Sequence, residues 1–256
     1  MIDYASFPDQ RQALIQQRIQ QQGRVVCVQL AQELQVSEHT IRRDLQELAS
    51  RGICKKVYGG AVSLALATGY FADRVEQQKE QKQKLGAACA ALLRDDACVF
   101  IDVGSTNLAV AKAISKDKPL TLVTHAPAIA LELMKLPQAK VILLGGTLNT
   151  AIGAAFGIGT LRQLQSMYFD QCLLGACSLD VQAGLCTNTL DDAEFKQAIV
   201  QQSSEVLVAL TSDKVGTMAR HQVIAADAIH QLVLEGEVSD SKLQALLDKN
   251  IQLYRV

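Results

Sequence analysis

The sequence predicts an α/β protein in which a small N-terminal winged helix-turn-helix domain precedes a larger domain with a mostly parallel sheet. Residues 25–48 have the apolar spacing of two short helices joined by a tight turn. From residue 98 onward, strand-like apolar runs alternate with helical patterns, which indicates a parallel sheet with helices on both faces. The length of 256 residues leaves room for both domains.

Apolar residues recur with helical spacing in both short helices: Leu30, Ala31 and Leu34 in the first, and Ile41, Leu45 and Leu48 in the second. Ser37 is expected to cap the second helix, because its hydroxyl can accept a hydrogen bond from the first helical turn. The opposite face carries Arg42 and Arg43, and adjacent arginines are typical of a helix that reads DNA. The alternative is an ordinary amphipathic hairpin with a solvated charged face.

The flanking segments also fit a DNA-binding unit. A first helix is expected from Pro8 to about Gln22, followed by a short strand at residues 24–26. Gly52 permits a turn into the alternating segment 53–58. We expect this segment to form a two-stranded wing that brings its lysines near the DNA backbone.

Charge and cysteine usage exclude several classes of protein. The net charge is −1, but residues 1–62 hold eight Lys and Arg against six Asp and Glu. Local basic patches would therefore have to bind phosphates. The seven cysteines are odd in number and contain no C-x-x-C pair, so neither a disulfide framework nor a zinc site is predicted. No signal peptide is expected at the N-terminus, and the uncharged segment 141–161 holds five glycines, unlike a membrane span.

The segment Ser-x-x-Thr-Ile-Arg-Arg-Asp-Leu at 37–45 resembles the helix-turn-helix signature of the DeoR family of bacterial transcriptional regulators. The match extends upstream to Arg11 and Gly23 and downstream to residues 59–61. The recognition helix and wing together give the expected DNA-binding residues: Ser37, His39, Thr40, Arg42, Arg43, Lys55, Lys56 and Tyr58.

The expected domains are a DNA-binding domain at 1–62, a linker and connecting helix at 63–84, and a sensor domain at 85–256. After a helix at 85–93, the sensor domain should hold strands at 98–103, 120–124, 141–144, 171–175, 206–210, 229–234 and 251–254. The helices between them are expected at 106–114, 127–134, 160–167, 190–202 and 239–247.

A candidate ligand cradle follows the first of these strands, at residues 102–106. Ligands bind beyond the carboxyl ends of parallel strands, where Gly104 lets a ligand approach the backbone. The hydroxyls of Ser105 and Thr106 and the helix N–H groups favour phosphate, and Asp102 can accept sugar hydroxyls. Many α/β turns share this pattern without binding anything, and His125 could simply satisfy a carbonyl at a strand end.

The strand-end pieces together resemble the C-terminal effector domain of the DeoR family, which is related in fold to ribose-5-phosphate isomerase. The resemblance implies these effector-binding residues: Asp102, Gly104, Ser105, Thr106, Thr124, His125, Gly145, Gly146, Gly175, Asp180, Lys196 and Lys214. The chain departs from the family's usual residues at His125, Cys177, Asp192 and Thr211, where Asn, Asn, Glu and Asp are common. The resemblance therefore does not fix which effector binds.

The sequence thus predicts a cytoplasmic, DNA-binding transcriptional regulator, more specifically a repressor of carbohydrate-metabolism genes. A phosphorylated sugar or related metabolite would modulate its affinity for a double-stranded operator, and a homo-oligomer would read paired half-sites. No enzymatic activity, cofactor or metal is expected. The alternatives are a sugar-phosphate isomerase with Asp102, Asp180 or Asp192 as general base, or an orphan regulator with a vestigial pocket.

Overall fold

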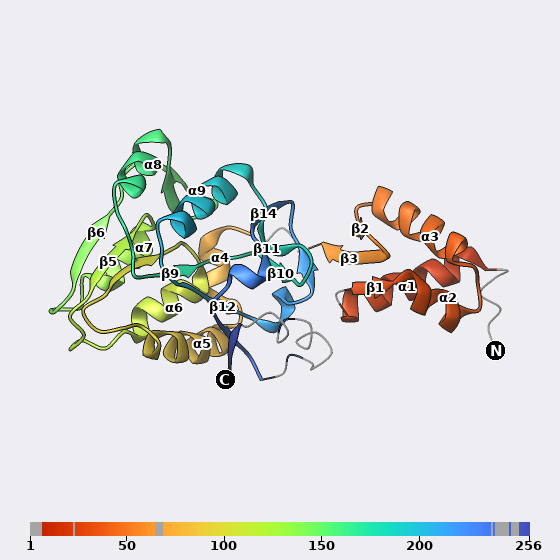
Figure 1. Ribbon diagram of the computed structural model, residues 1–256, viewed down its shortest axis with the longest axis horizontal. Coiled ribbons are helices and arrows are strands. Elements are labelled where there is room, and N and C mark those ends of the chain that lie inside the picture. Colours follow the sequence, from red (N-terminus) through yellow and green to blue (C-terminus); the bar gives the residue numbers. More distant parts are fainter. Residues whose placement is uncertain (1–6, 23, 65–68, 237, 239–245, 247–250) are drawn as a thin grey trace.

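The computed structural model describes residues 7–22, 24–64, 69–236, 238, 246 and 251–256. It consists of a small, mainly helical lobe and a larger lobe built on a sheet, and the two meet near strand β3 (Figure 1). The α/β class predicted from the sequence is confirmed, because an N-terminal helix-turn-helix unit precedes a parallel α/β domain.

The small lobe is formed by α1 (Pro8–Gln22), β1 (Arg24–Val26), α2 (Cys27–Leu34), α3 (Glu38–Ser50), β2 (Cys54–Val57) and β3 (Gly60–Leu64). The apolar residues that predicted the helix pair are buried here and pack together in one core. Gln35 ends α2 in the left-handed region, with φ 54°, so the turn into α3 is tight. The wing is an antiparallel hairpin in which Val57 faces Gly60. Its first strand lies within the alternating segment 53–58, whereas its second strand lies beyond that segment.

Gly60 is required where the wing meets the strand before α2. A Cβ atom at this position would lie 1.9 Å from the carbonyl oxygen of Val25. Because the clash would be with the backbone, no side-chain movement could relieve it. The β1 and β3 backbones pair antiparallel there, with Val26 opposite Gly60. This close approach fixes the wing against the helical core.

The larger lobe contains a parallel sheet whose strands lie in the order β16 (Gln252–Arg255), β15 (Gln231–Leu234), β12 (Val206–Leu210), β9 (Gln171–Leu174), β4 (Cys98–Ile101), β5 (Thr121–Thr124) and β6 (Lys140–Leu143). Two sets of helices cover it: α5 (Lys79–Ala91), α6 (Ser105–Ala113) and α7 (Pro127–Leu133) on one face, and α8 (Ile158–Gln165) and α9 (Leu190–Gln201) on the other. A separate hydrophobic core fills each interface. Central strands such as β9 and β12 are buried along their whole length, as expected for a sheet covered on both faces.

Several short elements have no counterpart in the sequence prediction: β7 (Thr147–Asn149), β8 (Ala154–Phe156), β10 (Ser178–Asp180), β11 (Gly184–Thr187), η1 (Ser212–Lys214), β13 (Thr217–Met218), β14 (His221–Ile224) and η2 (Ala226–Ala228). Helix α4 (Phe71–Glu76) lies within the segment 63–84, which was expected to hold a linker and a connecting helix. Strands of two to four residues are too short for a period to be recognised. The segment 141–161, expected to be a loop, contains the β7–β8 hairpin. The helix expected at 239–247 lies almost entirely outside the described residues, as does part of the linker expected within 63–84.

Backbone pairing joins the two lobes. Strand β13 of the larger lobe pairs in parallel with the end of β3, with Thr217 opposite Ser63. Beside this pairing, Arg24 of β1 forms an ion pair with Asp180 of β10 at 3.7 Å and also donates to the side chain of Gln182. Strand β3 therefore extends two residues past the boundary expected at residue 62 and forms part of the contact between lobes.

The order of the strands also locates the ligand crevice. The chain passes from β4 to β5 and β6 on one side, whereas β9 lies on the other side of β4. The order in which the chain adds strands to the sheet therefore reverses between β4 and β9. In open parallel sheets this is where ligands bind, beyond the carboxyl ends of the two strands.

Candidate functional site

Helix α3 presents a basic face to solvent. The side chains of Arg42 and Arg43 are 62% and 78% exposed. They form ion pairs along the helix, Arg42 with Glu38 at 2.8 Å and Arg43 with Glu47 at 3.7 Å. Exposed pairs of this kind are weak, so both guanidinium groups can turn to DNA at little cost.

The start of α3 has the expected cap. Ser37 Oγ accepts a hydrogen bond from the backbone N–H of Thr40 at 3.1 Å, and the two hydroxyl oxygens lie 2.9 Å apart. The Ser37 hydroxyl is therefore engaged within the helix terminus. His39, one residue before Thr40, is exposed on the face that carries the arginines.

A buried polar contact sets the position of α3 against α1. Arg11 binds Asp44 through two bonds, from Nε to Oδ2 at 2.6 Å and from Nη2 to Oδ1 at 3.1 Å. Gln12 donates to the same carboxylate at 3.1 Å. Asp44 lies on the inner face of α3, so this contact orients the outer face.

The wing lysines occupy opposite faces of β2, because successive side chains in a strand alternate. Lys56 lies beside α3, where its Nζ donates to Gln46 at 2.8 Å. Lys55 is exposed on the other face. Tyr58, at the tip of the wing, is fully exposed. The structure thus joins Lys56 to the recognition face and directs Lys55 elsewhere.

A cavity of about 360 Å³ lies at the crevice between β4 and β9. Six of the residues expected at the effector site line it: Gly104, Ser105, Thr106, Gly175, Lys196 and Lys214. They come from the start of α6, the end of β9, the middle of α9 and η1. Tertiary folding therefore brings together segments more than 100 residues apart.

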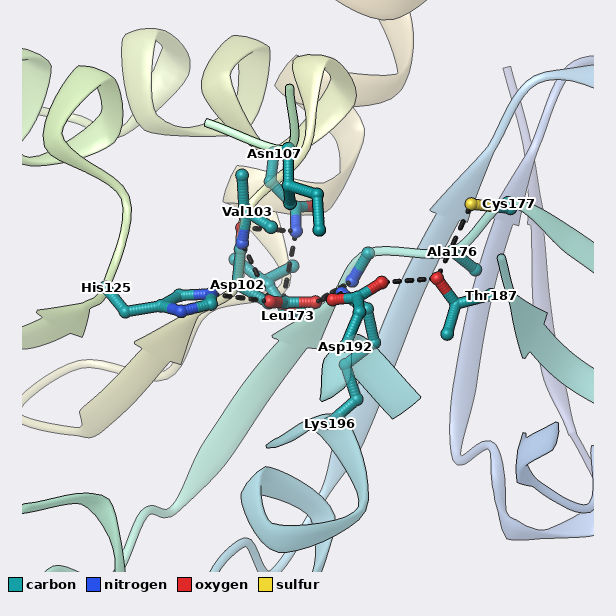
Figure 2. A network of polar contacts seen from close by, with 12 residues as sticks. Asp102, Val103, Asn107, His125, Leu173, Ala176, Cys177, Thr187, Asp192 and Lys196 are labelled. Carbon is teal, nitrogen blue, oxygen red and sulfur yellow. Dashed lines mark hydrogen bonds and ion pairs between the residues drawn. The ribbon is translucent and has the colours of Figure 1, made fainter. Parts of the chain in front are cut away.

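Asp102 lies behind this wall and does not line the cavity. One carboxylate oxygen accepts from Val103 N at 2.8 Å and faces His125 Nε2 at 3.1 Å. The other accepts from Gly175 N at 2.8 Å and from Lys196 (Figure 2). Burial alone would raise the pKa of Asp102, but Lys196 and His125 hold it below its ordinary value. Asp102 organises the wall, and its oxygens are not free for sugar hydroxyls as the sequence suggested.

Lys196 continues this network into the cavity. Besides Asp102, its ammonium group contacts Asp192 Oδ1 at 3.2 Å, and Asp192 also accepts a hydrogen bond from Thr187. Burial opposes the charge on Lys196, but the two carboxylates raise the pKa of the lysine above its ordinary value. The charge on Lys196 is therefore maintained and largely compensated.

Two other cations face the cavity without such compensation. Lys214 donates to the carbonyl oxygen of Ala176 at 3.1 Å, and Arg74 donates to the carbonyl oxygens of Gly69 and Ile152. Neither forms an ion pair with any residue that the structure describes. Burial lowers the pKa of both side chains. A bound anion would relieve this cost.

The start of α6 supplies a third feature suited to an anion. The Thr106 hydroxyl is buried at the cavity wall and has no hydrogen-bond partner among the described residues. It lies in the first turn of a nine-residue helix, where backbone N–H groups favour negative charge.

The remaining expected effector residues lie away from the cavity lining. Thr124 caps the backbone N–H of Ala126 at 3.2 Å, and His125 is buried behind Asp102. Gly145 and Gly146 pack against α8; a Cβ at Gly146 would lie 2.0 Å from Thr160 Oγ1. Asp180 turns towards the small lobe.

Several lining residues were absent from the sequence prediction: Tyr70, Arg74, Asn107, Thr187, Asn188 and Thr189. Cys177 and Asp192, which the sequence marked only as departures from the family's usual residues, also line the cavity. Arg74 falls in the segment expected to be a connecting helix, and no local pattern separates it from other surface cations. The polar run at 187–189 before α9 was a usable signal, because it matches the pattern that identified the start of α6.

No group of three or more His, Cys, Asp or Glu side chains is arranged to hold a metal ion in the part of the chain that the structure describes. Among the same residues, no helix combines the length and apolarity needed to cross a bilayer.

Comparisons with known proteins cover both lobes. The DeoR-like helix-turn-helix domain matches residues 11–65, and the DeoR C terminal sensor domain matches residues 77–236. The glycerol-3-phosphate regulon repressor of Escherichia coli (strain K12) is 30% identical over 95% of this chain and 97% of its own. The HTH-type transcriptional regulator GolR of Listeria innocua is 29% identical over 96% of each chain.

Solved structures show only weaker likenesses. The full-length sorbitol operon regulator SorC of Klebsiella pneumoniae has a TM-score of 0.43 and 14% identity over 92% of this chain and 97% of its own. Ribose 5-phosphate isomerase A of Methanocaldococcus jannaschii has a TM-score of 0.40 and 11% identity over 54% and 55% of the two chains. The family models, which match at both lobes, and the near full-length relatives agree: this chain belongs to the DeoR family of transcriptional regulators.

Proposed function

We propose that this protein is a transcriptional repressor whose affinity for operator DNA is modulated by a phosphorylated sugar or a related phosphorylated metabolite. The observation that carries the effector part is the cavity, where Arg74 and Lys214 have no carboxylate partner among the described residues. A phosphate dianion needs such partners. The inference that the protein represses transcription rests on the family and on relatives that are named as repressors.

DNA binding is assigned to α3 and the wing. Arg42 and Arg43 are placed to reach guanine edges or phosphates, and His39 to reach a base edge. Thr40 and Lys56 would contact phosphate, which gives affinity without sequence preference. We assign this unit to residues 1–64 and the sensor domain to the chain from Lys79 onward, with α4 between them.

The effector's phosphate is assigned to the start of α6. There the backbone N–H groups and the Thr106 hydroxyl face the cavity. Arg74 and Lys214 supply the balancing charge, and a volume of about 360 Å³ suits a ligand of this class. The phosphate would give Thr106 the hydrogen-bond partner it lacks.

The isomerase alternative finds no support in the site. Asp102 is surrounded by four hydrogen-bond donors and is fully buried, so it cannot take a proton from a substrate. Asp180 lies at the contact between lobes, and Asp192 is held by Lys196 and Thr187. The relatives that span nearly the whole chain are regulators.

We further propose that the regulator acts in the cytoplasm as a symmetric oligomer. One chain carries one recognition helix, whereas helix-turn-helix proteins read half-sites through two-fold partners. A closed dimer or a tetramer would supply that symmetry.

A fluorescence anisotropy titration tests the proposal. An operator is first selected from random duplexes by the purified full chain, and sugar phosphates and glycerol phosphate are then titrated into the complex. At least one should release the operator, with a shift of roughly 5- to 150-fold in affinity. If the chain selects no sequence, the DNA assignment is wrong. If the operator binds but no phosphorylated compound shifts the affinity, the cavity assignment is wrong and the orphan alternative gains support.

A further inference from the structure

The side chain of His125 occupies an unusual site behind the cavity wall. It is fully buried at the end of β5. Its ring stacks on Phe195 of α9, with centroids 4.5 Å apart and planes inclined by 19°, and meets the edge of Phe156 at 5.2 Å. The ring points towards Asp102 (Figure 2). Histidine is thus held in one orientation between aromatic side chains.

Each ring nitrogen faces an oxygen atom. Nδ1 lies 2.9 Å from the carbonyl oxygen of Ala155, and Nε2 lies 3.1 Å from Asp102 Oδ1. A carbonyl oxygen can only accept a hydrogen bond, so Nδ1 must carry a hydrogen. The backbone fixes this arrangement from the other side, because Ala155 N donates to the carbonyl oxygen of His125 at 2.8 Å.

The second nitrogen must carry a hydrogen as well. Asp102 accepts from the backbone N–H groups of Val103 and Gly175 and from the ammonium group of Lys196. These donors stabilise the ionised carboxylate and leave no room for a proton on it. The hydrogen between Asp102 and His125 therefore belongs to Nε2, and the imidazole is doubly protonated.

From this geometry we propose that His125 is a buried imidazolium that balances the charge of the network under the cavity. Without the imidazolium, Asp102, Asp192 and Lys196 would together carry one net negative charge directly behind the ligand. With it, the network is neutral. The positive charge of Arg74 and Lys214 is then fully available to an anion. His125 is in this sense a positioning residue, since it acts on the ligand through Asp102 and Lys196.

The surroundings of the ring support a cation. Asp102, at the end of β4, is the charged group in contact with it. Behind Asp102 lie Lys196 of α9 and the thiol of Cys172 on β9, whose pKa burial raises to about 12, so that it stays uncharged. The faces of Phe195 and other aromatic rings carry partial negative charge, which favours a stacked cation.

The first test is nitrogen-15 NMR of the histidine side chains in the full chain. There are four histidines, and His125→Phe identifies the signal of interest. We expect both His125 nitrogens to be protonated at pH 7. A single protonated nitrogen at pH 7 would overturn the proposal. This measurement needs no ligand, so its result stands even if the proposed effector class is wrong.

The second test measures the affinity of the full chain for inorganic phosphate by calorimetry; this part rests on the proposed function. His125→Phe should weaken phosphate binding by about tenfold, which corresponds to roughly 1.4 kcal/mol. Adding Asp102→Asn removes the uncompensated carboxylate and should recover most of the loss. A structural role predicts the opposite, a further loss in the double variant. That outcome would contradict the charge-balancing role.

Controls separate the remaining outcomes. His221→Phe, on the half-exposed strand β14, should leave phosphate binding unchanged. Thermal unfolding checks that each variant is folded, and His125→Gln replaces His125→Phe if the latter does not fold. If the wild-type chain binds no phosphate, the proposed effector class fails, whereas the NMR result still decides the state of His125.

Discussion

At the scale of single residues, the contrast between Asp102 and Lys214 shows how burial and partners decide a role. Both are polar residues beyond strand ends, and both look like ligand contacts in the sequence. Asp102 has four donors around it and no access to the cavity, whereas Lys214 reaches the cavity and holds only a carbonyl oxygen. We therefore expect a ligand to contact the lysine, whereas the aspartate holds the wall in place.

Replacing both arginines of the recognition face should abolish specific DNA binding. Arg42→Ala with Arg43→Ala removes contacts worth about 1–3 kcal/mol each when they reach base edges. Lys56→Ala should weaken binding to all sequences and flatten its salt dependence, because it removes a phosphate contact. Lys55→Ala is the matched control, since this neighbouring lysine points away from α3. Gel shifts across a salt series, with circular dichroism as a folding check, measure these effects. Operator affinity that survives the double arginine change would refute the assignment.

Lys214→Gln should separate sensing from DNA binding. The substitution removes a cation that lines the cavity, so a phosphorylated effector should lose its ability to release operator. Operator affinity without effector should stay close to that of the wild type, because Lys214 is not on the recognition face. Lys116→Gln, an exposed lysine after α6, is the control. Anisotropy titrations with and without effector provide the measurement; release at the wild-type effector concentration would show that Lys214 is not part of the site.

At the scale of elements, the long amphipathic pieces were predictable and the short ones were not. The spacing of Ile41, Leu45 and Leu48 predicts helix α3, because apolar residues on one buried helical face recur about every 3.6 residues. The parallel strands were found because they are continuous apolar runs between helices. Short strands such as β13 depend on partners distant in sequence, so no local pattern marks them.

The residues of the candidate site also divide into those that the sequence could predict and those that it could not. The start of α6 could be found because glycine and hydroxyl residues must follow a strand where a ligand approaches the backbone. Arg74 could not, because its place in the cavity depends on the path of α4 over the larger lobe. Asp180 was misplaced for a related reason: its carboxylate accepts from the backbone N–H groups of Gln182 and Ala183 in a turn, and that turn faces the small lobe.

Helix α5 offers a prediction about pH, because Lys82 is buried on it with no carboxylate in contact among the described residues. Burial, reinforced by Lys214, lowers the pKa of Lys82 from 10.5 to about 8. Below pH 8 the lysine is charged in both folded and unfolded states, so the cost of burying the charge is fully present. Between pH 8 and 10.5 the folded chain releases this proton more readily than the unfolded chain, and stability rises.

Urea unfolding at pH 7 and pH 9.5 measures this effect by comparison with Lys82→Met. The free energy of unfolding of the wild type should rise relative to the variant by at most about 1.4 kcal/mol per pH unit above pH 8. Lys84→Met, two residues along the same helix and exposed, should show no such difference. If the difference in the free energy of unfolding between the wild type and Lys82→Met is the same at pH 7 and pH 9.5, Lys82 is not the titrating group.

At the scale of the whole molecule, the contact between lobes lies close to the cavity. Lys214 ends η1, and three residues later β13 begins to pair with β3 of the wing hairpin. Lys214 Nζ donates to the carbonyl oxygen of Ala176, which leaves two of its three N–H bonds for an anion. Thr217 Oγ1 donates to the Lys214 carbonyl oxygen at 2.8 Å. We therefore expect a ligand on Lys214 to act on the segment that pairs with β3 of the small lobe.

Weakening the contact between lobes should reduce this coupling without removing either binding event. Arg24→Gln loses the ion pair with Asp180 across the lobes. We expect the effector to bind as before but to shift operator affinity several times less than in the wild type, because coupling requires an element that both sites bias. Arg18→Gln, which breaks an ion pair with Glu33 inside the small lobe, is the control. Calorimetry for the effector and anisotropy for the operator measure the two affinities, and an unchanged shift would exclude Arg24 from the coupling.

The pairing of β3 with β13 also bears on how such regulators can diversify. Main-chain hydrogen bonds make this joint, so it accepts almost any side chains provided that Ser63 and Thr217 keep their register. The DNA-binding domain could thus be exchanged for that of another regulator, while the sensor domain is kept. The boundary of the exchanged domain must lie after Leu64. If it lay at residue 62, the residues of β3 that pair with β13 would come from a different regulator than the rest of the strand. Arg24 and Asp180 would have to be matched across the seam, which makes them the compatibility test for a chimeric regulator.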